Sequence, residues 1–259
     1  MSSLPQADHS SSTRRPEILI EDAHAFCEVA TEQTTGGHVW QAAHTLLDYF
    51  EARPSLLAAQ PSVIELGAGT GFLGMSLARD FAVSRIILTE MITGGALTWL
   101  DRNVQRNRDA GLQLETLSTA ALDWSWADEA AVVPAEEPGV DPSAAREAVF
   151  GVAWDVVIGS DLVYNEIGVY MLPKVFARLL ANGTTIAYYA HTLNRYEFLD
   201  RDFFEALGAE GLRCEQVWPD AGASSAEEEG ASALADDDEP FSGELFPEQR
   251  IVVFSIIPR

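Results

Sequence analysis

The stretch that most constrains the fold is 63–71, which reads Val-Ile-Glu-Leu-Gly-Ala-Gly-Thr-Gly. A short apolar run leads into Gly67, Gly69 and Gly71, and a helical pattern follows at once. This order predicts a buried strand, a tight loop and a helix N-terminus, as at the start of a nucleotide-binding α/β fold. The dinucleotide fingerprint is G-x-G-x-x-G, whereas this loop is G-x-G-x-G, so we expect a ligand other than a dinucleotide pyrophosphate. A structural turn without a ligand is the alternative.

Strands and helices alternate along the rest of the chain. This alternation predicts an α/β, Rossmann-like fold: a seven-stranded, mostly parallel sheet with an antiparallel last strand and helices on both faces. In such a sheet, ligands bind at the carboxyl ends of the strands. The strands are predicted at 62–66, 85–90, 112–117, 154–161, 184–189, 212–217 and 251–257, and the helices at 39–51, 71–81, 93–108, 168–181 and 196–208.

The domain organisation expected from composition is simple. Residues 1–16 are polar and Ser-rich and are predicted to be a disordered tail. Residues 17–259 are predicted to form one domain, beginning with a short strand and a helical or irregular piece at 17–28. Two stretches are predicted to be surface insertions, one at about 127–150 and an acidic one at 219–247.

The net charge of −24 excludes some partners. Such a surface repels phosphates, which argues against a nucleic-acid substrate. No apolar stretch is long enough to span a bilayer, and the N-terminus lacks a secretory signal. The two cysteines and the histidines have no metal-ligand spacing, so we expect no metal site. The expected protein is a cytoplasmic monomer, with the nucleus as a second location.

Glu90 ends the second predicted strand, about two dozen residues past the glycine loop. A carboxylate there can accept hydrogen bonds from both hydroxyls of a ribose, which is common to adenosine-cofactor enzymes of several chemistries. An ordinary strand-end acid is the alternative.

Four pieces in this order resemble a known family. Glu65–Gly71 with Glu90 resembles the cofactor site of class I, seven-strand methyltransferases that use S-adenosyl-L-methionine. Three further segments resemble the family-16-type protein-lysine methyltransferases, namely the V-W-x-A-A helix at 39–43, the L-x-W segment at 122–124 and the D-x-x-Y motif at 161–164. The family often has Asp where this chain has Glu90, and both acids can bind a ribose.

The resemblance implies roles for particular residues. Trp40 closes over the methionine end of the cofactor, Glu90 holds the ribose, and Trp124 lines the adenine pocket. Asp161 and Tyr164 face the target amine as the catalytic pair. The remaining cofactor contacts are expected from the backbone of the glycine loop and from the end of the fourth strand, at Gly67, Ala68, Gly69 and Ser160.

The chemistry of methyl transfer to lysine fits these residue types. The attacking amine must be neutral, and a free lysine titrates near 10.4. Asp161 can orient the amine by accepting its N–H, and Tyr164 can offer a ring face. The alternative is a purely structural role, with Asp161 as a helix N-cap and with Tyr164 and Trp40 in the core.

The implied function is methyl transfer to a lysine of a protein substrate, with translation factors and chaperones as natural candidates. A small-molecule methyltransferase and a catalytically inactive binding module remain open. Two other classes fit less well, because base-methylating enzymes carry two prolines where this chain has Leu162 and Val163, and dehydrogenases require G-x-G-x-x-G.

Overall fold

The computed structural model describes residues 15–21, 26, 36–128, 141–219 and 250–259. The predicted tail, apart from its last two residues, lies outside the described residues. The same holds for 129–140 of the first predicted insertion and for nearly all of the acidic one. The structure does not test the division into a tail and one domain.

The described residues form one seven-stranded sheet in the order β3-β2-β1-β4-β5-β7-β6. Strands β1 to β5 run parallel, and β7 pairs antiparallel with both of its neighbours. The predicted sheet, with its antiparallel last strand, is confirmed. The strands are β1 (Ser62–Leu66), β2 (Arg85–Glu90), β3 (Leu117–Ala121), β4 (Val156–Ser160), β5 (Ile186–Leu193), β6 (Leu212–Trp218) and β7 (Arg250–Pro258).

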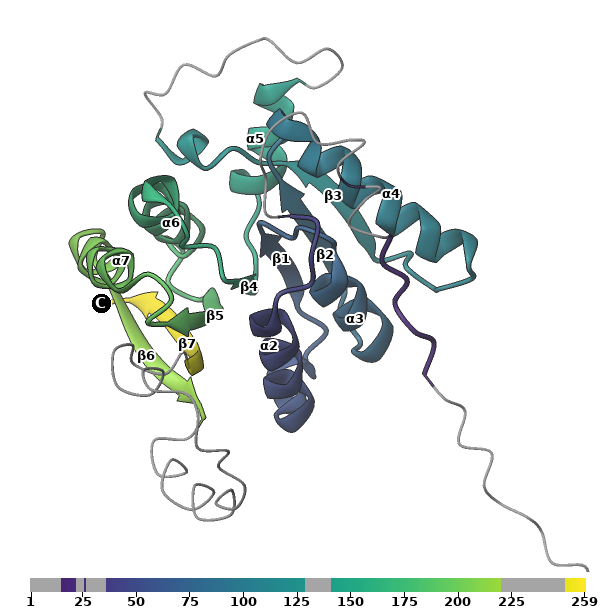
Figure 1. Ribbon diagram of the computed structural model, residues 1–259, viewed down its shortest axis with the longest axis horizontal. Helices are drawn as coiled ribbons and strands as arrows, with labels where there is room; N and C mark the ends of the chain where they lie inside the picture. The colour runs from purple at the N-terminus through teal and green to yellow at the C-terminus, as the bar shows by residue number, and fades with distance from the viewer. Residues whose placement is uncertain (1–14, 22–25, 27–35, 129–140, 220–249) are drawn as a thin grey trace, which may run out of the picture.

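Helices cover both faces of this sheet (Figure 1). Helices α2 (Gln41–Ala52), α3 (Phe72–Asp80) and α4 (Ala96–Asp109) pack on one face, and α5 (Pro142–Phe150), α6 (Glu166–Leu179) and α7 (Glu197–Ala209) pack on the other. Three short 3₁₀ turns connect them, η1 (Pro54–Leu57), η2 (Thr93–Gly95) and η3 (Trp124–Ala127). No helix among the described residues is long and apolar enough to cross a membrane.

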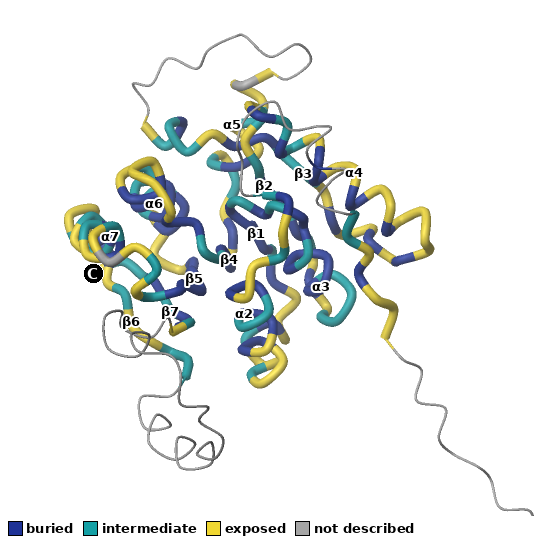
Figure 2. The backbone as a smooth tube through the Cα atoms, in the orientation of Figure 1, coloured by how far each residue is buried: buried dark blue, intermediate teal, exposed yellow. Residues whose placement is uncertain are grey.

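The central strands are buried on both faces, as Figure 2 shows for β1 and β4. Successive residues of a strand point to opposite faces. Val63 therefore joins the core under α2 and α3, and Ile64 joins the core under α6 and α7. This two-sided burial explains why the strands read as continuous apolar runs.

One predicted strand was wrong in position. The third strand was predicted at 112–117 but lies at Leu117–Ala121. Leu112 and Leu114 are instead buried residues of the connecting loop, packed into the core without sheet pairing. The predicted insertion at about 127–150 contains α5, which Asp141 caps by accepting from the backbone N–H groups of Ser143 and Ala144.

The first described segment, 15–21, is not the strand that was predicted. The side-chain amide of Asn107 pairs with both backbone groups of Leu19 at 2.8 Å, and the Asn103 side chain accepts from the Glu21 N–H at 3.0 Å. Side chains of α4 thus satisfy this backbone in place of a neighbouring strand.

Helix α2 covers the sheet with an aromatic cluster. The rings of Phe50 and Tyr188, on β5, lie 5.4 Å apart and nearly perpendicular. Phe50 is fully buried, whereas Asp48 of the same helix is exposed.

Phe50→Ala should lower the free energy of unfolding by about 3–5 kcal/mol, because it leaves a cavity between α2 and the sheet. Asp48→Ala, at an exposed position of the same helix, should change it by about 0.5 kcal/mol or less. Urea denaturation followed by circular dichroism measures both, and equal losses in the two variants would contradict this packing.

Candidate active site

A cavity of about 310 Å³ opens at the carboxyl ends of β1, β2 and β4. The parallel register brings these strand ends together, and the start of α2 closes one side. All the site residues predicted from the sequence line this cavity, namely Trp40, Gly67, Ala68, Gly69, Glu90, Trp124, Ser160, Asp161 and Tyr164. Their assigned roles remain predictions.

The glycine loop turns through left-handed backbone at Gly67, Gly69 and Gly71, with φ of 56°, 55° and 79°. Side chains rarely adopt this region, and glycine does so at no cost. A Cβ at Gly67 would also lie 2.6 Å from the Leu162 side chain. The loop is therefore fixed by packing against the D-x-x-Y segment as well as by its own conformation.

Glu90 links β2 to the glycine loop. Its Oε1 accepts from the Gly69 N–H and its Oε2 from the Met91 N–H, both at 2.9 Å. Burial raises the pKa of Glu90, and the two amides oppose that rise. Because each carboxylate oxygen has two acceptor positions, one remains on each for the two hydroxyls of a ribose.

Glu65 is a second carboxyl group in the cavity wall, and the sequence reasoning gave it no role. It is 2% exposed, and its Oε2 has no hydrogen-bond partner. Burial raises its pKa to about 8, and the negative charge of Glu90 adds to the rise. The Oε2 atom of Glu65 lies against the backbone of Gly74 in α3, and the Gly74 N–H opposes the rise in pKa.

Asp161 is not the helix cap that the alternative required, since Asn165 caps α6 by accepting from the Gly168 N–H. The Asp161 carboxylate instead accepts from the Thr192 N–H at 2.7 Å, the Thr192 hydroxyl at 2.9 Å and Arg195 Nη1 at 2.9 Å. A carboxylate has about four acceptor positions, so one is left on Oδ1.

The D-x-x-Y spacing places its ends at the cavity and its middle in the core. Leu162 and Val163 are buried, whereas the Tyr164 side chain is 40% exposed at the cavity mouth. Trp40 is likewise 37% exposed and Trp124 is half-buried, so neither Tyr164 nor Trp40 is a plain core residue.

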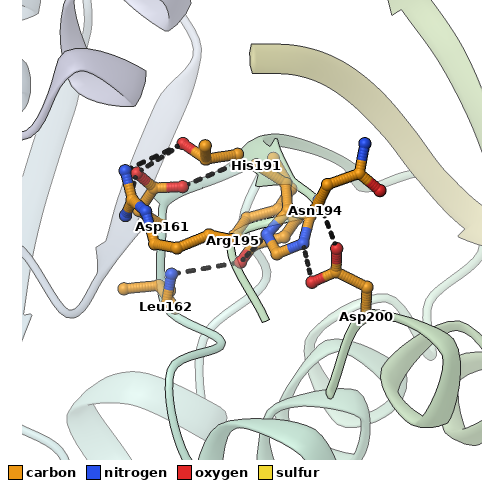
Figure 3. A network of polar contacts seen from close by, with 8 residues as sticks. Asp161, Leu162, His191, Asn194, Arg195 and Asp200 are labelled. Atoms are coloured by element: carbon orange, nitrogen blue, oxygen red, sulfur yellow. Dashed lines mark hydrogen bonds and ion pairs between the residues drawn. The ribbon is translucent and has the colours of Figure 1, made fainter. Parts of the chain in front are cut away.

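A polar network behind the cavity went unrecognised in the sequence (Figure 3). His191 is buried, and its Nε2 donates to Asp200 Oδ1 at 2.8 Å. Its Nδ1 lies 3.2 Å from the Tyr189 hydroxyl, which in turn accepts from the Leu162 N–H. Because a carboxylate only accepts, the His191 proton is assigned to Nε2.

This network and the Asp161 contacts come from the end of β5, which approaches the end of β4 through the parallel pairing of Ser160 with Ala190. The only sequence signal was the polar content of the segment after the fifth strand. In the described part of the chain, no three His, Cys, Asp or Glu side chains are grouped to hold a metal ion.

Replacing Glu65 should change the pH dependence of stability. Between about pH 5 and 8 the folded protein keeps the Glu65 proton that the unfolded chain releases, so stability falls as pH rises through this window. In Glu65→Gln that loss should be absent, and its free energy of unfolding should gain on wild type by up to about 1.4 kcal/mol per pH unit. Urea titrations at several pH values measure the difference, and a constant difference would contradict the assignment.

Residues 22–137 match the family model described as lysine methyltransferase. EEF1A lysine methyltransferase 3 of Mus musculus is 32% identical over 176 residues, which cover 62% of this chain and 64% of that protein. The chain thus aligns with just under two thirds of that relative's length.

Solved structures show a weaker likeness. EvdMO1 has a TM-score of 0.45 and 16% identity, covering 92% of this chain and 47% of that one. A TehB-like SAM-dependent methyltransferase from Corynebacterium glutamicum has a TM-score of 0.43 and 13% identity, covering 85% and 99%. Since both scores are below 0.5, the fold assignment rests on the strand order. The family match, in contrast, agrees with the resemblance predicted from the motifs: residues 22–137 of this chain are similar to the lysine methyltransferase family.

Proposed function

We propose that this protein is an S-adenosyl-L-methionine-dependent protein-lysine N-methyltransferase. The observation that carries the proposal is one cavity that joins the glycine loop and Glu90 on one side to the turn from Asp161 to Tyr164 on the other. The first pair suits an adenosine cofactor, and the second suits a positioned amine. The match of residues 22–137 to the lysine methyltransferase model supports the same reading.

The residues present fit the cofactor. The open acceptor positions of Glu90 suit the hydroxyl groups of the ribose. Gly67 and Gly69 let a ligand approach the backbone closely, and Trp124 offers an aromatic wall. When bound, S-adenosyl-L-methionine supplies a methyl group on a positively charged sulfur.

The chain's own contribution is to orient a neutral amine. Three donors already occupy the Asp161 carboxylate. Its remaining position on Oδ1 can accept one N–H and so direct the nitrogen lone pair. Positioning of this kind supplies a large part of the rate of a displacement reaction. The exposed ring of Tyr164 can contact the aliphatic stem or the charged product, worth about 0.5–2 kcal/mol.

The mouth of the cavity favours a protein over a small molecule as substrate. Four large apolar side chains of the cavity lining are exposed by 37–59%, namely Trp40, Met91, Tyr164 and Ile167. A small-molecule site usually encloses most of its ligand, whereas an exposed apolar rim is typical of a surface that meets another protein.

The substrate class proposed first is a translation factor. The mouse relative carries EEF1A in its name, which makes that factor the first candidate to test. A chaperone is the second candidate. We further propose a cytoplasmic monomer, present also in the nucleus. The net charge of −24 favours a basic protein surface over nucleic acid or an anionic membrane.

Purified protein incubated with tritiated S-adenosyl-L-methionine should label a protein band in lysate that lacks the enzyme, and mass spectrometry should place the methyl group on lysine. EEF1A and chaperone fractions are tested first. Label confined to small molecules would favour the small-molecule alternative. Binding of the cofactor without any label would favour an inactive binding module.

Two variants should separate the cofactor and acceptor halves of the cavity. Glu90→Ala removes both ribose acceptors and should weaken S-adenosyl-L-methionine binding by about tenfold to a hundredfold, since hydrogen bonds to a charged group contribute about 1.5–3 kcal/mol. Asp161→Ala should keep S-adenosylhomocysteine binding within a few-fold but reduce turnover strongly. Calorimetry and the label assay measure the pair, and the reverse pattern would contradict the assigned roles.

A further inference from the structure

Arg195 joins two walls of the cavity that the sequence analysis treated separately. Its Nη1 lies 2.9 Å from Asp161 Oδ2, its Nη2 donates to the Thr192 hydroxyl at 3.2 Å, and its guanidinium carbon stacks 5.0 Å from the centre of the Trp40 ring. The side chain is 24% exposed and that of Asp161 is 3% exposed. The ion pair is thus largely shielded from water. Charges attract each other more strongly in such a shielded place than in water.

The backbone on both sides of this pair is fixed. Asp161 and Asn194 both adopt left-handed backbone, with φ of 51° and 63°, just beyond the ends of adjacent parallel strands. The Asp200 carboxylate holds the second turn by accepting from the Asn194 N–H at 2.8 Å, and His191 holds Asp200. Figure 3 shows the two turns directing Asp161 and Arg195 toward each other.

The pairing sets the charge of the cavity wall. An unpaired carboxylate beside the face of Trp40 would make a good site for an ammonium ion, because both groups attract cations. An amine held there would keep its proton and would not attack a methyl group. Arg195 cancels the charge of Asp161 and covers the Trp40 ring, and it leaves one acceptor position on Oδ1.

We propose that Arg195 is a positioning residue of the methyl-transfer site, which holds Asp161 as an acceptor and makes the pair electrically neutral so that the cavity selects a neutral amine over an ammonium ion. This inference rests on the proposed function. It adds a specific discrimination: the site receives the target lysine in its reactive form.

Three probes test it by calorimetry at one pH, without a protein substrate. S-adenosylhomocysteine is uncharged at sulfur, S-adenosyl-L-methionine carries a sulfonium, and sinefungin carries an amine in place of the sulfonium methyl group. The ratio of the S-adenosylhomocysteine dissociation constant to that of each cationic probe measures cation preference. The other carboxyl groups of the cavity lining, Glu65, Glu90 and Asp123, are the same in every variant.

Arg195→Gln changes the charge of the pair from zero to −1, so the cation preference should rise by about fivefold or more. Asp161→Asn leaves an unpaired guanidinium and should lower it. The double variant restores a neutral pair and should return close to wild type, and Arg195→Lys, which keeps the charge, should do the same. Arg201→Gln is the matched control, because Arg201 is exposed and pairs with Asp202 outside the cavity lining.

If Arg195→Gln weakens the binding of all three probes equally, the proposal is overturned, because a purely structural role of Arg195 predicts that result. An unchanged preference, as in the Arg201→Gln control, would overturn it too. If the wild type binds none of the probes, the proposed function fails and this inference fails with it. The two failures are distinguishable, because failure of the Arg195 role alone leaves wild-type binding intact.

Discussion

The hydrogen bond from the Gly69 N–H to Glu90 Oε1 is the contact on which the site depends, because it joins the glycine loop after β1 to the end of β2. A glycine loop alone can take many conformations. This contact restricts the loop to the observed conformation, together with the packing of Leu162 against Gly67. The backbone bond from the Ala68 N–H to the Thr89 carbonyl oxygen, at 2.9 Å, fixes the same junction. The cofactor half of the cavity is therefore preorganised for its ligand, which lowers the entropy cost of binding.

Burial of two carboxyl groups in one wall gives the cavity its electrostatic character. Glu65 and Glu90 lie close enough for the charge of Glu90 to act on Glu65, and burial raises the pKa of both. Buried carboxyl groups lower the stability of the fold. Carboxyl groups with a shifted pKa in a cavity are typical of functional sites. On the opposite wall, Asp161 is neutralised by Arg195. One wall is thus suited to polar groups of a cofactor, and the other to an uncharged nucleophile.

Much of the fold could be predicted, since strands buried on both faces are continuous apolar runs and helices show a 3.6-residue period. The third strand was misplaced because Leu112 and Leu114 are apolar for a different reason: they fill the core from a loop. Segment 15–21 was misread as a strand because its partners are the side chains of Asn103 and Asn107. Local pattern does not distinguish these cases.

Sequence alone determined the fold class and the location of the cavity, because glycine spacing, strand-end acids and apolar periodicity are local properties. The resemblance of its motifs to a known family grouped Trp40, Glu90 and Asp161, and the structure places all three in the lining of one cavity. Only the tertiary structure decided what surrounds Asp161, since Thr192 and Arg195 reach it through the pairing of β4 with β5. The charge and free acceptor positions of a carboxylate depend on neighbours about thirty residues away, and no local spacing contains that information.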